Sequence, residues 1–153
     1  MDIDSTFDFL IKQLAEAGLA GKPNQHGLPA HVRMWVRHNF RCAYCGCDLL
    51  NDLNSFYSAQ LDHLLPVAQY EELKDIEDNW ILSCFVCNHI KHSFDPVQYS
   101  NIPHSVAVTA DILKENKETL IDICRKHLDS RRKEREDLRK RIKGMISTTT
   151  TDN

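Results

Sequence analysis

Two Cys-x-x-Cys pairs, Cys42–Cys45 and Cys84–Cys87, constrain the fold of this chain more than any other feature of its sequence. Thiolates at this spacing can bind one metal ion from a tight turn, and four of them satisfy the tetrahedral preference of zinc. Residues 46–83 lie between the pairs, so one ion would pin two distant segments together. Because four cysteine ligands leave no position for water, we predict a structural zinc rather than a catalytic one.

The other two cysteines have different expected roles. Cys47 is an alternative zinc ligand that ranks below Cys45, and Cys124 falls on the apolar side of a predicted helix, which indicates a core position. The alternative to zinc is that the four cysteines of the pairs are ordinary buried side chains. Six cysteines in a cytoplasmic protein favour metal binding, because disulfides are rare in that compartment.

A cytoplasmic location is itself an expectation from the sequence. The segment Met1–Asp4 lacks the basic region and apolar core of a signal peptide. No run of 18 apolar residues is present, so we expect no membrane-spanning helix.

The length of 153 residues and the hydrophobic content of 42% predict one domain with a modest core, which a metal cross-link would help to stabilise. We divide the chain into an N-terminal helical segment (1–39), a core that contains the cysteines (40–96), a C-terminal helical extension (97–146) and a disordered tail (147–153).

Hydrophobic periodicity predicts the elements of an α+β fold. A first helix follows a capping sequence at Ser5 and stops near Gly18, and a second opens at Pro29. A long helix begins at about Thr109. Two short strands and a short helix are predicted between them, over 59–64, 80–82 and 85–93. The apolar stripe of the long helix comprises Ile112, Leu113, Leu120, Ile121, Cys124 and Leu128.

Residues suited to phosphodiester hydrolysis surround the two predicted strands and the short helix. His63 could act as a general base, because a neutral histidine accepts protons near pH 7. Asp62 and Asn88 offer hard oxygen ligands of the kind that Mg²⁺ or Mn²⁺ prefers. His92 lies one helical turn beyond Asn88 and is either a third ligand or a surface residue. We expect His89 to point elsewhere.

The order of these motifs resembles the HNH endonuclease family over about a third of the chain. The matching motifs are Cys42-Ala-Tyr-Cys45-Gly, Asp62-His63-Leu-Leu-Pro66, Asn79-Trp80-Ile-Leu82 and Cys84-Phe-Val-Cys87-Asn88-His-Ile-Lys91. Gln69-Tyr70-Glu71-Glu72 departs from the family pattern, which often has a glycine pair at this place.

The resemblance implies a ββα-metal core and a metal-dependent hydrolase that cleaves DNA to leave 5′-phosphate and 3′-hydroxyl ends. It implies Mg²⁺ or Mn²⁺ as the catalytic ion, and the asparagine at Asn88 favours Mg²⁺. Asn79 resembles the family's middle asparagine, which orients the base through hydrogen bonds to the nearby backbone.

Nucleic-acid binding must rely on local charge, because the net charge is −3. Between residues 125 and 143 there are ten bases and four acids, and between 17 and 47 there are four bases and no acid. The residues that we assign to DNA binding are Lys91, Arg37, Arg41, Arg131, Arg132 and Arg139. The C-terminal run could instead be a solvated helix face or a contact with a second copy of the chain or a partner protein.

Two other functions stay open at this stage. One is a non-catalytic zinc module that binds nucleic acid or protein, although pure binding needs neither Asp62, His63 nor Asn88. The other is an RNA-directed or effector nuclease within a larger complex.

Overall fold

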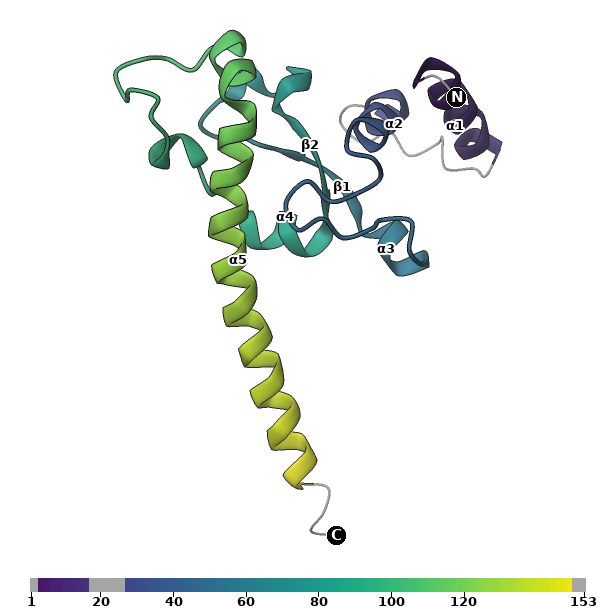
Figure 1. Cartoon of the computed structure of the whole chain (residues 1–153), viewed down its shortest axis with the longest axis vertical. Coiled ribbons are helices and arrows are strands. Elements are labelled where there is room, and N and C mark those ends of the chain that lie inside the picture. Colours follow the sequence, from purple (N-terminus) through teal and green to yellow (C-terminus); the bar gives the residue numbers. More distant parts are fainter. Residues whose placement is uncertain (1–2, 17–26, 150–153) are drawn as a thin grey trace.

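The computed structural model describes residues 3–16 and 27–149. A two-stranded sheet and several helices confirm the predicted α+β class (Figure 1). The helices are α1 (Ile3–Glu16), α2 (Gly27–Arg37), α3 (Leu53–Tyr57), α4 (Phe85–Lys91) and α5 (Ala110–Thr149). The strands are β1 (Ala59–His63) and β2 (Trp80–Cys84), and short 3-10 turns lie at η2 (Glu71–Leu73), η3 (Glu77–Asn79) and η4 (Pro96–Tyr99).

The antiparallel sheet forms the centre of the molecule. Leu61 pairs with Leu82, and His63 pairs with Trp80 at the end of the ladder. Every residue of β2 is buried, whereas β1 is only partly covered. This difference arises because α2 packs on β2 and α4 packs against both strands.

Helix α5 packs against this centre along its first half. Its predicted stripe is buried at Leu113, Leu120, Ile121, Cys124 and Leu128, so Cys124 is a core residue as expected. The stripe contacts η3, η4 and α4. The helix therefore covers the segments that lead into and out of the sheet.

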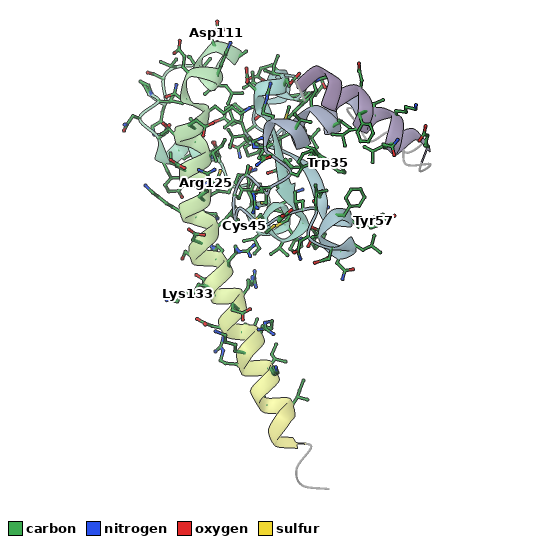
Figure 2. The ribbon with its side chains drawn as sticks, turned by 45° about the vertical axis from the view of Figure 1, so that its right-hand side comes forward. Trp35, Cys45, Tyr57, Asp111, Arg125 and Lys133 are labelled. Atoms are coloured by element: carbon green, nitrogen blue, oxygen red, sulfur yellow. The ribbon has the colours of Figure 1, made fainter. Side chains whose placement is uncertain are left out.

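The second half of α5 projects away from the body (Figure 1). Figure 2 shows Arg125 on the packed part of the helix and Lys133 on the projecting part. Apolar side chains are sparse beyond Leu128, and Leu138 and Ile142 are exposed. The fading of the apolar stripe thus marks the place where the helix leaves the core.

Helix boundaries differ from the sequence-based expectations in three places. Helix α1 begins at Ile3, before the capping sequence at Ser5, and α2 begins at Gly27, before Pro29. Helix α5 runs to Thr149, so 147–149 are helical rather than disordered, because extending a formed helix adds one hydrogen bond for each residue fixed. The predicted stop at Gly18, the following loop and 150–153 lie outside the described residues.

Smaller differences occur around the sheet. Strand β1 ends at His63, one residue early, and β2 continues to Cys84. Helix α4 stops at Lys91, because the next residue, His92, has a positive φ of 48° that no helix allows. Among the described residues, no helix is both long and apolar enough to cross a bilayer.

Candidate metal centre and active site

The first cysteine pair lies in a tight turn. Gly46 N donates to the Cys42 carbonyl at 2.8 Å, and Cys42 N donates to the Cys47 carbonyl at 3.0 Å. Gly46 has a φ of 70°, a conformation that residues with a Cβ rarely adopt, which explains the glycine after Cys45. The turn points its thiols toward the end of β2.

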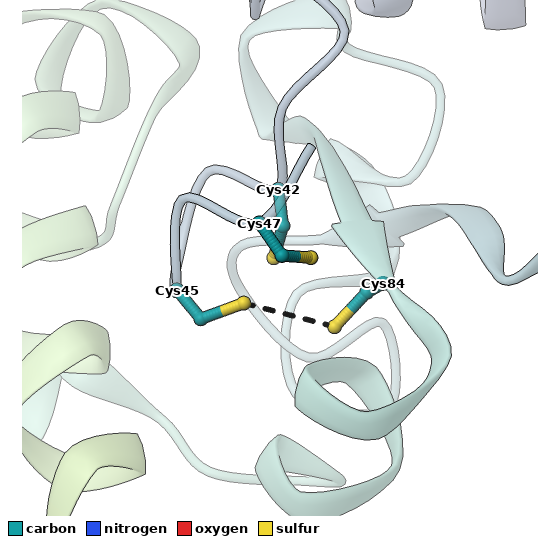
Figure 3. Close-up of side chains that lie close together, drawn as sticks. All are labelled: Cys42, Cys45, Cys47 and Cys84. Carbon is teal, nitrogen blue, oxygen red and sulfur yellow. Dashed lines mark hydrogen bonds between the residues drawn. The ribbon is translucent and has the colours of Figure 1, made fainter. Parts of the chain in front are cut away.

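The second cysteine pair joins β2 to α4. Cys84 is the last residue of β2 and caps α4, with its sulfur accepting from Cys87 N at 3.4 Å. Figure 3 shows the side chains of Cys42, Cys45, Cys47 and Cys84 converging on one point. Their four Sγ atoms all lie within 4.8 Å of one another.

The sulfur distances suit a zinc ion and exclude a disulfide. Cys45 Sγ and Cys84 Sγ are 3.9 Å apart, far beyond the S–S bond of about 2.05 Å. Tetrahedral zinc with Zn–S bonds of about 2.3 Å would place its sulfurs about 3.8 Å apart. Hydrogen bonding with Cys42 lowers the pKa of Cys45 and of Cys84, which favours the thiolate form that zinc binds. The cluster therefore fits a structural zinc.

The structure leaves two candidates for the fourth zinc ligand. Cys47, the alternative ligand, belongs to the tight sulfur cluster, whereas the predicted ligand Cys87 does not. Yet hydrogen bonds with Cys42, Cys45 and Cys84 raise the pKa of Cys87, so its sulfur borders the same cluster. Five thiols thus surround the position that a zinc ion would take. Cys42, Cys45 and Cys84 belong to both possible ligand sets, and Cys47 and Cys87 are the two candidates for the fourth ligand.

A cavity of about 460 Å³ lies beside the end of β1 and one face of α4. It brings together four residues that the sequence assigns to chemistry: Asp62, His63, Asn88 and His92. Segments that are far apart along the chain therefore meet at one site.

His63 is half-buried, and its Nε2 lies 2.9 Å from the Lys74 carbonyl. A carbonyl oxygen can only accept a hydrogen bond, so Nε2 carries the proton and Nδ1 is the nitrogen that can take one up. Trp80 Nε1 donates to the same carbonyl at 2.8 Å. This shared acceptor fixes the orientation of the imidazole.

Asn79 is fully buried and holds the loop that follows His63. Its Oδ1 accepts from Leu65 N at 2.7 Å, and its Nδ2 donates to the carbonyls of Leu65 at 3.2 Å and Leu73 at 3.3 Å. These are backbone contacts of the kind that the resemblance assigns to this asparagine. They connect the loop after β1 to the segment that precedes β2.

Asp62 is buried. Two neighbouring side chains contact the same oxygen of its carboxylate, Oδ2. Tyr44 donates its hydroxyl proton to Oδ2 at 2.8 Å, and Lys91 Nζ lies 3.3 Å from the same atom. Burial and the neighbouring Asp62 carboxylate raise the pKa of Tyr44, so this hydroxyl stays protonated and remains a donor. Tyr44 is a site residue that the sequence reasoning did not single out, although it stands between the first two cysteines.

Lys91, predicted to contact phosphate, lines the cavity and also makes contacts within the protein. Its side chain is 1% exposed, and its Nζ also donates to the His63 carbonyl at 2.7 Å. The lysine therefore ties Asp62 and His63 to α4 from within.

One face of α4 lines the cavity. Asn88 Nδ2 donates to Gln60 Oε1 at 2.6 Å, which leaves Asn88 Oδ1 available to a cation. His92 lines the cavity with Nδ1 3.0 Å from Ser93 Oγ. His89 also lines it, contrary to the expectation that it points elsewhere, and stacks on Phe85 with ring centroids 5.6 Å apart. The i, i+3, i+4 and i+7 spacing from Phe85 could have revealed this shared face.

The donor set at the cavity suits a hard cation better than a transition metal. Within the described part of the chain, only the cysteine cluster gathers three or more His, Cys, Asp or Glu ligand atoms. Asp62 and Asn88 would supply one carboxylate and one amide oxygen, and Mg²⁺ commonly takes few protein ligands and keeps several waters. The residues present therefore fit a magnesium ion.

The arginines assigned to DNA binding all have partners within the protein. Arg37 pairs with Glu77 at 3.0 Å, and Arg41 lies 3.6 Å from Asp48. On α5, the contacts are Arg131 with Glu134 at 3.2 Å, Arg139 with Glu136 at 2.7 Å, and Arg132 Nη1 with Cys87 Sγ at 3.3 Å. Arg132 thus contacts the cysteine site, which the charge pattern did not indicate.

The fold and the site together define a small ββα domain with a cysteine cluster on one side and a cavity with Asp, His and Asn on the other. Residues 42–94 match the family model described as HNH endonuclease, so this segment is similar to HNH endonuclease domains. The match covers about a third of the chain and includes both cysteine pairs, both strands and α4. No curated protein matches the chain.

Proposed function

We propose that this protein is a metal-dependent endonuclease that hydrolyses phosphodiester bonds in DNA. The observation that carries the proposal is the convergence of Asp62, His63 and Asn88 on one cavity within the segment that matches the family model. A protein that only bound nucleic acid would need none of these three side chains.

Each side chain has one role in the proposed reaction. His63 Nδ1 takes a proton from water, and the resulting hydroxide attacks the phosphorus. The bond to the 3′ oxygen breaks and that oxygen takes a proton from solvent, which leaves 5′-phosphate and 3′-hydroxyl ends. Asp62 Oδ1 and Asn88 Oδ1 would hold Mg²⁺ or Mn²⁺, which stabilises charge on the phosphate and the leaving oxygen. We assign His92, which lines the same cavity, as a third ligand.

Tyr44 and Lys91 position these groups. Both hold Asp62 through Oδ2, and Lys91 also holds the backbone of His63. Asn79 fixes the following loop, so the base and the ligand keep their relative positions.

The decisive experiment compares purified wild-type protein and His63→Ala on plasmid DNA, linear DNA and RNA, with Mg²⁺, Mn²⁺ or EDTA. We expect cleavage of DNA that EDTA abolishes and that the variant loses by about 10²–10⁴-fold, because a positioned general base contributes that much. A variant with wild-type turnover would remove His63 from the mechanism. Binding without any cleavage would favour the zinc-containing binding module, and cleavage of RNA alone would favour an RNA-directed or effector nuclease.

We also propose a cytoplasmic setting and an assembly role for α5. None of the described cysteines forms a disulfide, which is compatible with a reducing compartment. The projecting part of α5 exposes Leu138, Ile142 and Met145 at spacings of four and three residues, the pattern of a helix that pairs with a second copy or a partner. Light scattering on the intact protein tests this directly.

A further inference from the structure

The cavity contains an aromatic feature that hydrolysis does not require. Phe85 opens α4 and lines the cavity together with Asn88 and His89, yet 53% of its surface is exposed. An aromatic ring that lines the cavity of the proposed active site and remains open to solvent can stack on a ligand there.

One contact holds this ring, and a second anchors the backbone at the start of its helix. His89 stacks on it almost in parallel, with an interplanar angle of 11° and ring centroids 5.6 Å apart. Phe85 N donates to the Ser58 carbonyl at 2.7 Å, which anchors the start of α4 next to the sheet. The ring is thus an ordered platform and not a loose side chain.

The charge and size of the cavity favour a nucleotide as its occupant. Asp62 is the only acid among the residues that line it, and Lys91 neutralises that carboxylate from within. A volume of about 460 Å³ lies in the range of sites that hold a small ligand. An anionic phosphate can therefore lie beside Asn88 while its base reaches the platform.

We propose that Phe85, supported by His89, stacks on an unpaired nucleobase next to the scissile phosphate. The preferred substrate is then single-stranded DNA or a DNA junction, since in an intact duplex each base face is already covered by its neighbours. This inference rests on the proposed nuclease function, because it places the base beside the reacting phosphate.

The test measures binding without added Mg²⁺ or Mn²⁺, so that it does not depend on cleavage and leaves the structural zinc in place. Oligonucleotides of one sequence, single-stranded and duplex, are titrated in this buffer against wild type, Phe85→Leu and Phe85→Trp. Leucine keeps an apolar side chain but lacks a π face, so single-strand affinity should fall about tenfold, while duplex affinity changes less than twofold. Tryptophan should restore the affinity, and its fluorescence should be quenched by the single strand beyond the wild-type background.

Val86→Ala is the matched control, because Val86 is the next residue of α4, is 48% exposed and does not line the cavity. It should bind both substrates as wild type does. Equal losses on single strand and duplex with Phe85→Leu, or the same single-strand loss with Val86→Ala, would overturn the inference.

A cleavage experiment then locates the base that stacks on Phe85. Replacing one base at a time by an abasic spacer should slow cleavage at a single position beside the cut, and this sensitivity should disappear in Phe85→Leu. DNA cleavage without such a position would refute the stacking site alone. Phe85-dependent binding in a protein that never cleaves would refute the proposed nuclease and leave the stacking surface in place.

Discussion

Asn79 shows how one buried side chain can organise a candidate active site that it does not enter. All of its polar atoms are engaged, and its three partners belong to the backbone on both sides of the loop that follows His63. The position of the base therefore depends on this amide as well as on its own contact with the Lys74 carbonyl.

Replacing Asn79 with alanine should destabilise the protein by about 2–3 kcal/mol, because it leaves buried backbone groups of Leu65 and Leu73 without partners. Urea denaturation measures this loss. The turnover number should fall as well, since the loop of His63 is released. A variant that unfolds at the wild-type urea concentration would contradict this role.

The fourth zinc ligand can be assigned by serine substitutions. We expect Cys87→Ser to lose zinc and to unfold, because Cys87 is fully buried beside the cluster and metal binding is coupled to folding. Cys47→Ser should retain about one zinc per chain by elemental analysis. The opposite result would assign the ligand to Cys47, in agreement with the tight sulfur cluster.

At the scale of elements, α5 is the connection between the cysteine site and the outer part of the molecule. Arg125 Nε donates to the Ala43 carbonyl at 2.8 Å, within the first cysteine turn. Two turns further along, Arg132 reaches the sulfur of Cys87. The helix therefore contacts both cysteine segments before it projects into solvent.

Arg132→Gln should weaken zinc retention by roughly 10-fold, because hydrogen bonds to metal ligands contribute about that much to affinity. Competition with a chromogenic chelator measures it. Arg131→Gln is the matched control, since Arg131 is adjacent and exposed and forms a salt bridge with Glu134. Equal zinc affinities in the two variants would show that the contact with Cys87 has no effect on the metal.

The projecting basic face of α5 predicts a salt-dependent contribution to DNA binding. Its pairs with Glu134 and Glu136 are exposed and therefore weak, so Arg131 and Arg139 can exchange these partners for phosphates. Replacing Arg131, Arg139 and Arg141 with glutamine should lower the salt slope by up to about 2.7, at about 0.9 for each phosphate contact. Cleavage at saturating DNA should change little. If the salt dependence of DNA binding is unchanged, dimerisation or partner docking would remain as the role of the projecting part of α5.

For the whole molecule, His38 lies where the N-terminal helical segment meets α5. Burial, and then the charges of Lys117, Arg37 and Arg125, lower the pKa of His38 from 6.5 to about 4. No hydrogen-bond partner contacts its Nε2 among the described residues. The folded protein therefore keeps this histidine neutral at a pH where the unfolded chain protonates it.

The unfolding free energy should consequently fall as the pH decreases from 6.5 toward 4, because the unfolded state binds more protons in this range. His38→Gln should show a shallower decline. Denaturation across this pH range, with zinc content checked at each point, measures the difference between the two proteins. Identical pH profiles would show that His38 is not the titrating group.

The sequence by itself determined the cysteine pairs, the two strands, the helix after Cys84 and the motif that contains Asp62, His63 and Asn88. These features depend on local periodicity and on spacings along the chain, which survive without any knowledge of packing. The resemblance to a known family, rather than any local pattern, implied that Asn79 forms hydrogen bonds to the nearby backbone.

Only the tertiary structure decided which side chains share a surface. It placed Lys91 against Asp62, Arg132 against Cys87, and Phe85 with His89 inside the cavity. Each of these contacts depends on which face α4 or α5 turns toward a segment that is distant in sequence. Charge counts and motif spacing do not show how each helix is rotated about its own axis, because packing of the buried side chains sets this rotation.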